Sequence, residues 1–190
     1  VLLVDTTSDA NLAACTIAPA DCSFRGALGA AATGDYIKFD TANVFTSAAA
    51  GTIHVGAPLP TVTQGLVTIQ GDWQKVVVDG AGAGAGVDGL VIASAHNFVM
   101  GITVRGFGGH GLVVDDVPET WIGTCQPGDG GLNRVQLVNN GGYGLRIHGE
   151  LELEVLVATS GRDGHRVHAR DARAQLHHVG DGEAPPRLEH

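Results

Sequence analysis

The sequence predicts an all-β fold, a short parallel β-helix (solenoid) whose N-terminal end is covered by a helix. One phrase recurs, glycine, a large aliphatic residue, any residue and a second aliphatic residue, at Gly89–Ile92, Gly111–Val114 and Gly144–Ile147. Glycine is abundant, at 29 of 190 residues, whereas aromatic and charged residues are scarce. The recurring segments are rich in Val, Ile and Thr, which favour strands. A repeat of about 20–22 residues that is built from short strands and glycine turns is typical of a solenoid.

The N-terminal part, residues 1–35, is expected to form a strand and a capping helix. Leu2–Asp5 has the composition of a strand, and Cys22–Ala32 that of a short helix. Asp21 or Ser23 can cap the start of this helix, and Gly34 can end it. A helix in this place would cover the open apolar end of the solenoid.

The turns of the solenoid are expected within residues 36–168. Short segments bounded by glycine, proline or aspartate predict the first strands, Tyr36–Phe39, Thr52–Val55, Val67–Ile69 and Val76–Val78. A worn fourth copy of the recurring phrase, Gly164–Val167, is expected to form the last turn, although it places His165 at the inward position.

Residues 169–190 form an atypical tail that ends in what looks like a cloning scar before an affinity tag, Leu188–His190. Beyond Glu150 arginine and histidine become frequent and glycine punctuation nearly stops. Two interpretations stay open. Either the native reading frame or domain ends near residue 150, or the segment is a divergent cap.

The three cysteines predict one disulfide bond. Cys15 and Cys22 lie in a polar, turn-rich segment, and we expect them to be bridged, which implies an oxidising compartment. The alternative is a pair of free thiols in a cytosolic protein. Cys125 is the odd cysteine and is expected to be unpaired.

Charge and hydropathy exclude two classes of partner. The net charge is −9, and the first 150 residues carry no basic stripe, which argues against nucleic-acid binding. The sequence contains no apolar run long enough to predict a membrane span. The composition fits an acidic protein that is secreted or displayed at a cell surface.

Several motifs, in order, resemble those of bacterial secreted right-handed parallel β-helix proteins of the pectin-lyase-like type. Cys22–Ala27 (Cys-Ser-Phe-Arg-Gly-Ala) resembles their Cys-Ser-Leu-Arg-Glu-Ala signature, with Gly26 in place of the usual glutamate. Gly34–Phe39 resembles the Gly-Asp-x-Ile-x-Phe that follows the signature. Further matches in order are Leu59–Thr63, Val67–Gly71, Val78–Gly80 and Trp121–Thr124. The resemblance implies a right-handed coil and a secreted location, but no common catalytic set.

The register of the repeats places polar side chains on the outside. Because side chains alternate along a strand, Arg146 and His148 face outward if Leu145 and Ile147 fill the core. The same register turns Asp115 outward one turn earlier.

A divalent-metal site is one prediction from this register. If the worn copy stacks as the next turn, His168 follows His148 and Asp115 in one column. Two histidines and one carboxylate suit Zn²⁺ or another divalent metal. Arg146 and Arg166 would lie beside the column and hold an anionic group. The alternative is a solvated face with ordinary surface histidines.

A second constellation surrounds His110, within Gly109–Gly111. β-Helix pectin hydrolases carry a Gly-His-Gly and a later Arg-Ile-Lys, which Arg146–His148 resembles, but the paired acidic motifs of those enzymes are absent. Asp88 supplies one carboxylate, and inverting hydrolysis needs two.

Three functions are therefore expected in decreasing order of support. The first is a secreted surface or binding module for a glycan or another partner. The second is a zinc-dependent hydrolase of esters or phosphoesters, which would bind a small anionic ester. The weakest is a polysaccharide-degrading enzyme. We also expect a homodimer, through the C-terminal end or an outward sheet, because a short solenoid exposes sheet edges and apolar surface.

Overall fold

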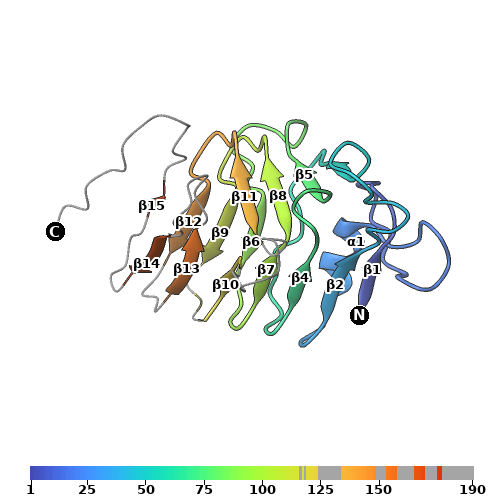
Figure 1. Cartoon of the computed structure of the whole chain (residues 1–190), viewed down its shortest axis with the longest axis horizontal. Coiled ribbons are helices and arrows are strands. Elements are labelled where there is room, and N and C mark those ends of the chain that lie inside the picture. The colour runs from blue at the N-terminus through green and yellow to red at the C-terminus, as the bar shows by residue number, and fades with distance from the viewer. Residues whose placement is uncertain are drawn as a thin grey trace.

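The computed structural model is a coil of short strands with one helix at its N-terminal end (Figure 1). It describes residues 1–115, 117, 119–123 and 134–148, together with the strands Leu153–Val157, His165–Ala169 and Gln175–Leu176. Cys125, which is expected to be unpaired, and most of the tail lie outside these residues.

Three sheets form the coil, and the strands of the coil itself are parallel. Sheet I contains β1 (Leu2–Val4), β2 (Tyr36–Phe39), β4 (Thr68–Gln70), β7 (Phe98–Met100) and β10 (Trp121–Ile122). Sheet II contains β3 (Thr52–His54), β5 (Val77–Asp79), β8 (Ile102–Arg105) and β11 (Val135–Val138). Sheet III contains β6 (Leu90–Ile92), β9 (Leu112–Asp115), β12 (Leu145–His148) and β15 (Gln175–Leu176).

The chain visits the sheets in a fixed cycle. From β4 to β12 it passes through sheets I, II and III in turn, three times. The turn before these three contains β2 and β3, and there a single parallel bridge between Val62 and Ile92 takes the place of a strand in sheet III. The predicted solenoid is thus confirmed as a stack of three-sided turns.

Aliphatic side chains fill the interior because the strands stack in register. In sheet I the inward ladder consists of Ile37, Ile69, Val99 and Ile122, all buried. In sheet III, Leu90, Leu112 and Leu145 pair in one column, and Ile92, Val114 and Ile147 in the next. Burial of such ladders is the main force that stabilises each turn on its neighbour.

The helix α1 (Phe24–Ala30) covers the N-terminal end of the interior. Its side chains Phe24, Ala27 and Leu28 belong to the same buried cluster as Val4 and Ile37. The helix is shorter than predicted. Ser23 caps its start by accepting the N–H of Gly26, and Ala31 rather than a glycine ends it.

Arg25 and Gly26 explain why the cap fits. The guanidinium of Arg25 binds both carboxylate oxygens of Asp9, at 3.0 and 2.9 Å, and the carbonyl oxygens of Ala57 and Pro58. It thereby joins the cap to the first turn. A side chain at Gly26 would collide with the Leu12 carbonyl, which accounts for glycine where the resemblance leads one to expect glutamate.

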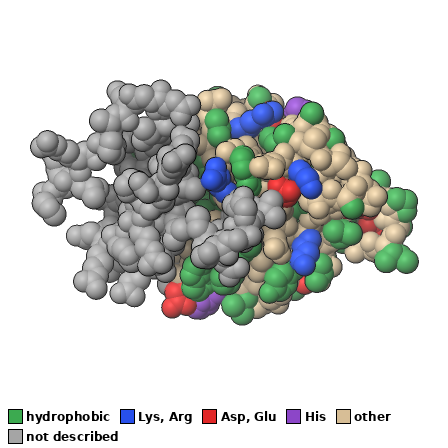
Figure 2. Space-filling view, in the orientation of Figure 1, with side chains coloured by type: hydrophobic (Ala, Val, Ile, Leu, Met, Phe, Trp, Pro, Cys, Tyr) green, Lys and Arg blue, Asp and Glu red, His purple; other side chains and the backbone are tan. Residues whose placement is uncertain are grey.

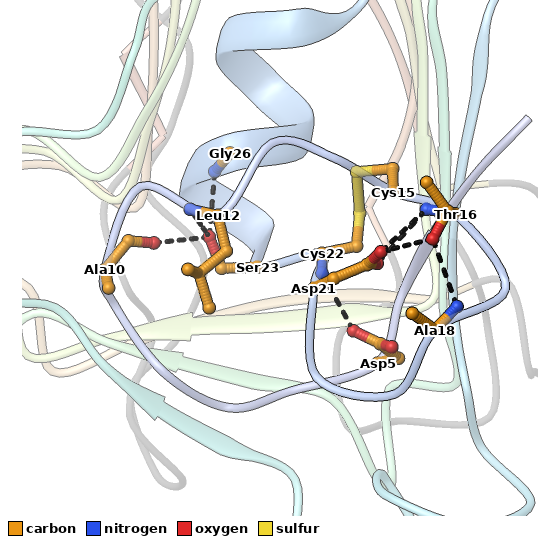
Figure 3. Close-up of a disulfide and its surroundings, with 10 residues drawn as sticks. All are labelled: Asp5, Ala10, Leu12, Cys15, Thr16, Ala18, Asp21, Cys22, Ser23 and Gly26. Atoms are coloured by element: carbon orange, nitrogen blue, oxygen red, sulfur yellow. Dashed lines mark hydrogen bonds between the residues drawn. A yellow bond between two sulfur atoms is a disulfide. The ribbon is translucent and has the colours of Figure 1, made fainter.

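The predicted disulfide between Cys15 and Cys22 is present (Figure 3). It closes a loop in which Asp21 accepts hydrogen bonds from the backbone N–H and the hydroxyl of Thr16. Asp21 therefore holds this loop and does not cap the helix. Cys22 is fully buried and its N–H donates to Asp5. A disulfide of this kind indicates a protein that functions outside the cytoplasm.

The C-terminal end departs from the predicted coil. The worn copy lies in β14 (His165–Ala169), which pairs antiparallel with β13 (Leu153–Val157) and does not stack on β12. β12 instead pairs antiparallel with β15. The prediction of another parallel turn was therefore wrong, and the physical reason is visible in the sequence, since His165 cannot replace a large aliphatic residue in an apolar interior.

The described residues include no helix that is both long enough and apolar enough to cross a membrane.

Candidate functional site

The outer side of sheet III brings several predicted residues together. Asp115 at the end of β9 pairs in register with His148 at the end of β12. The Nδ1 atom of His148 lies 3.4 Å from a carboxylate oxygen of Asp115, and both side chains are more than half exposed. Because the carboxylate accepts hydrogen bonds only, it favours a proton on Nδ1 of His148.

Arg146, two residues earlier on β12, uses the other nitrogen of this ring. Its Nη2 atom lies 2.6 Å from Nε2 of His148. With the proton on Nδ1, Nε2 can accept this hydrogen bond. Asp115 thus orients His148, and His148 holds one end of the half-buried guanidinium of Arg146.

His110 lies on the other side of the guanidinium. The backbone N–H of Tyr143 donates to Nδ1 of His110 at 2.8 Å, and the two rings are stacked with centroids 5.3 Å apart. This bond assigns the proton of a neutral His110 to Nε2, which lies 3.4 Å from Nη1 of Arg146. Two hydrogen-bond donors, one from His110 and one from Arg146, therefore lie next to each other, and no acceptor from the described residues lies between them.

Asp88 fixes the loop that carries His110. Its carboxylate accepts the backbone N–H of His110 at 2.7 Å. Asp88 is consequently engaged in holding the backbone.

Sequence reasoning missed Tyr143, although a signal was present. Asp88, His110 and Tyr143 each precede a glycine and a leucine, so they occupy the same position in three successive turns. Alignment of these three frames alone predicts one column of side chains next to Arg146.

The charge of Arg146 is not matched by a carboxylate among the described residues. Arg25 pairs with Asp9 and Arg105 pairs with Asp79, both at 2.9 Å. The described neighbours of the Arg146 guanidinium are the imidazoles of His110 and His148. The site therefore presents a fixed cation and adjacent N–H groups, a combination that binds oxyanions.

The predicted metal ligands are only partly brought together. His168 and Arg166 lie in β14, opposite Glu154 and Leu156 of β13, and their side chains are outside the described part of the chain. Within the described residues, no three His, Cys, Asp or Glu side chains form a group that could hold a metal ion. Asp115 and His148 do not suffice for a zinc site.

His148 also has no nitrogen to spare in this arrangement. Nδ1 faces Asp115 and Nε2 accepts from Arg146. A metal ion would have to displace one of these partners, so the geometry favours anion binding through Arg146.

Comparison of the chain with protein-family models, with characterised proteins and with solved structures finds no match.

Proposed function

We propose that the protein is a secreted β-helix binding module that binds an anionic group, such as a carboxylate of an acidic glycan, on the outer side of sheet III. One observation carries the proposal. The guanidinium of Arg146 is held between two histidines, and the Nε2–H of His110 lies next to it with no described acceptor. An oxyanion at this point would accept from both groups.

Three further facts support a binding role. The motif order in the first 148 residues resembles that of secreted β-helix proteins. The Cys15–Cys22 disulfide fits an oxidising compartment. Parallel turns place side chains at regular spacing along the sheet, which suits an extended ligand such as a polysaccharide.

Calorimetric titration with two oligosaccharides that differ only in carboxylate groups tests the proposal. We expect the acidic oligosaccharide to bind and the neutral one to bind much more weakly. Arg146→Gln should weaken binding of the acidic ligand by about 10-fold to 100-fold, because a charge-assisted hydrogen bond contributes about 1.5–3 kcal/mol.

Arg105→Gln is the matched control. Arg105 lies on the outer side of sheet II and its charge is paired with Asp79, so its loss should leave the affinity unchanged. Equal binding of neutral and acidic ligands, or equal effects of the two arginine substitutions, would contradict the proposal.

A second candidate, a metal-dependent hydrolase, retains one supporting observation, the Asp115–His148 pair on adjacent strands. In that function a divalent ion would activate water for attack on an ester or phosphoester, and arginines would stabilise the anion that develops. Titration of the protein with Zn²⁺ separates the candidates. Zinc binding that is lost in His148→Ala, together with chelator-sensitive ester hydrolysis, would favour the hydrolase.

A further inference from the structure

Large apolar side chains line the outside of sheet I. Its strand pairing defines two outward columns, one of Tyr36, Thr68, Phe98 and Trp121 and the other of Leu3, Lys38, Gln70 and Met100. Met100 is the only methionine of the chain, and Trp121 is one of two tryptophans. Scarce residue types that are common in protein interfaces are thus concentrated on this face.

This face is exposed at its N-terminal end and partly buried further along, where Thr68 is buried. Leu3 is 44% exposed and Tyr36 is 46% exposed, while Phe98, Met100 and Trp121 are half-buried. Figure 2 shows hydrophobic side chains along the lower edge of the view, on the side of β2. Large apolar side chains that stay partly exposed on one face are typical of an interaction site.

The charge of the face favours contact with a second copy of the chain. Lys38 is the only charged residue in the two columns. The chain as a whole carries a net charge of −9, so most pairs of surfaces from two copies would repel each other. Two copies that meet through sheet I bring no carboxylate of these columns against another.

The aromatic rings are poorly placed to bind a sugar. A sugar stacks on an open ring face, but the rings of Phe98 and Trp121 lie against each other, 4.5 Å apart and nearly parallel. The ammonium of Lys38 lies over the ring of Tyr36, 5.9 Å from its centroid. The rings consequently present edges, which pack well against the side chains of another sheet.

We propose that two copies of this chain associate through the outer faces of sheet I, with Leu3, Tyr36, Phe98, Met100 and Trp121 in the contact. Two sheets packed face to face lie about 10 Å apart with their side chains interdigitated. A two-fold arrangement uses the same patch on both copies and closes as a dimer. This inference goes beyond the proposed function, because sheet III and its site take no part in the contact.

Light scattering of the full chain over a range of micromolar concentrations tests the proposal. The wild-type protein should show twice the chain mass of 19.4 kDa. Met100→Glu and Tyr36→Glu should each weaken the dimer at least 10-fold, and the double substitution should give a monomer. Tyr36 is exposed enough for its substitution to leave the fold intact, which circular dichroism and thermal unfolding of each variant would verify.

His54→Glu is the matched control, since it adds a carboxylate at an exposed outward position of sheet II. It should leave the dimer unchanged. A wild-type monomer at all concentrations overturns the proposal. So does a dimer that resists the sheet I substitutions, which would place the contact elsewhere. Binding of a neutral oligosaccharide that Tyr36→Glu abolishes, without any dimer, would assign this face to a glycan.

Discussion

Sheets I and III are built on the same ladder but present opposite chemistry to the outside. In both sheets the inward positions are aliphatic and buried. In sheet III, the residue just before the first inward-facing residue of each parallel strand is a glycine, namely Gly89, Gly111 and Gly144. In sheet I the same position carries Tyr36, Thr68, Phe98 and Trp121. The inward positions therefore determine the solenoid. The residue just before them contributes to the chemistry that each sheet presents to the outside.

The difference fits the two proposed roles, ligand binding at sheet III and assembly through sheet I. Glycines in sheet III let adjacent turns approach closely and leave Arg146 and His148 as the prominent side chains at its C-terminal end. In sheet I, Tyr36, Phe98 and Trp121 give the outer face a more apolar character, with Lys38 as the single charge of its two outward columns. A ligand site and an assembly surface can thus coexist on one short coil without sharing residues.

The largest expected effect concerns the glycine column. A Cβ atom at Gly89 would collide with the carbonyl oxygen of Gly111 in the next turn and with Val104. We expect Gly89→Ala to lower the free energy of unfolding by about 3 kcal/mol, because neither backbone can yield without disturbing the sheet. Urea denaturation measures this change.

Gly29→Ala provides the control for this substitution. Gly29 lies within α1, and a methyl group there meets nothing within 4 Å. Alanine should leave stability unchanged or raise it by about 0.5–1 kcal/mol through its helix propensity. Equal effects at Gly89 and Gly29 would show that a methyl group at Gly89 does not clash with the next turn of sheet III.

The disulfide should stabilise the end at which sheet I begins without affecting sheet III. Replacement of Cys15 and Cys22 by serine should lower the free energy of unfolding by about 2–3 kcal/mol, as expected for a short closed loop. The affinity of the Arg146 site for an acidic ligand should not change, because the disulfide belongs to the N-terminal cap. A loss of ligand affinity in the folded variant would show that the two regions are coupled.

Loss of the contact between His148 and Arg146 should have a smaller effect, and only on ligand affinity. His148→Ala removes the imidazole that positions the guanidinium, an indirect effect on the ligand, so affinity for an acidic ligand should fall by only about 3-fold to 10-fold. His96→Ala is a suitable control, because His96 pairs with Glu119 away from this site. If His148→Ala binds as tightly as the wild type, Arg146 does not depend on it.

The glycine phrase allowed the solenoid and the register of sheet III to be predicted, because glycine and leucine recur at equivalent positions such as Gly111 and Leu112. The outward column of sheet I gave no such signal. Tyr36, Thr68 and Trp121 share no residue type, and the turns between them differ in length. Inward residues are restricted in type by the space they fill, whereas outward residues are not, so only the inward positions repeat a recognisable residue type.

The site was predicted in part for the same reason. Alternation placed Asp115, Arg146 and His148 outward. It could not foresee that the Tyr143 N–H donates to His110, since this depends on the backbone of a loop. It also misplaced His168, because an antiparallel pair of strands follows where another turn was expected. The warning was His165, a polar residue at the position where each earlier copy carries leucine.

The smallest expected effect concerns the response of the chain next to sheet I to acid. Asp40, which follows β2 of sheet I, accepts a hydrogen bond from the side chain of Asn43 and others from nearby backbone N–H groups, and these bonds lower its pKa. A carboxyl group whose pKa is lower in the folded state stabilises that state above its unfolded pKa, and this contribution disappears as the pH falls through the folded pKa. Asn43→Ala should therefore lower the melting temperature slightly at neutral pH and hardly at all in acid, because the exposed carboxylate is partly screened by solvent. Thermal unfolding of both proteins across the acidic range measures the difference. A gap between the two melting temperatures that is the same at every pH would mean that Asn43 acts by packing and that Asp40 contributes no acid sensitivity to sheet I.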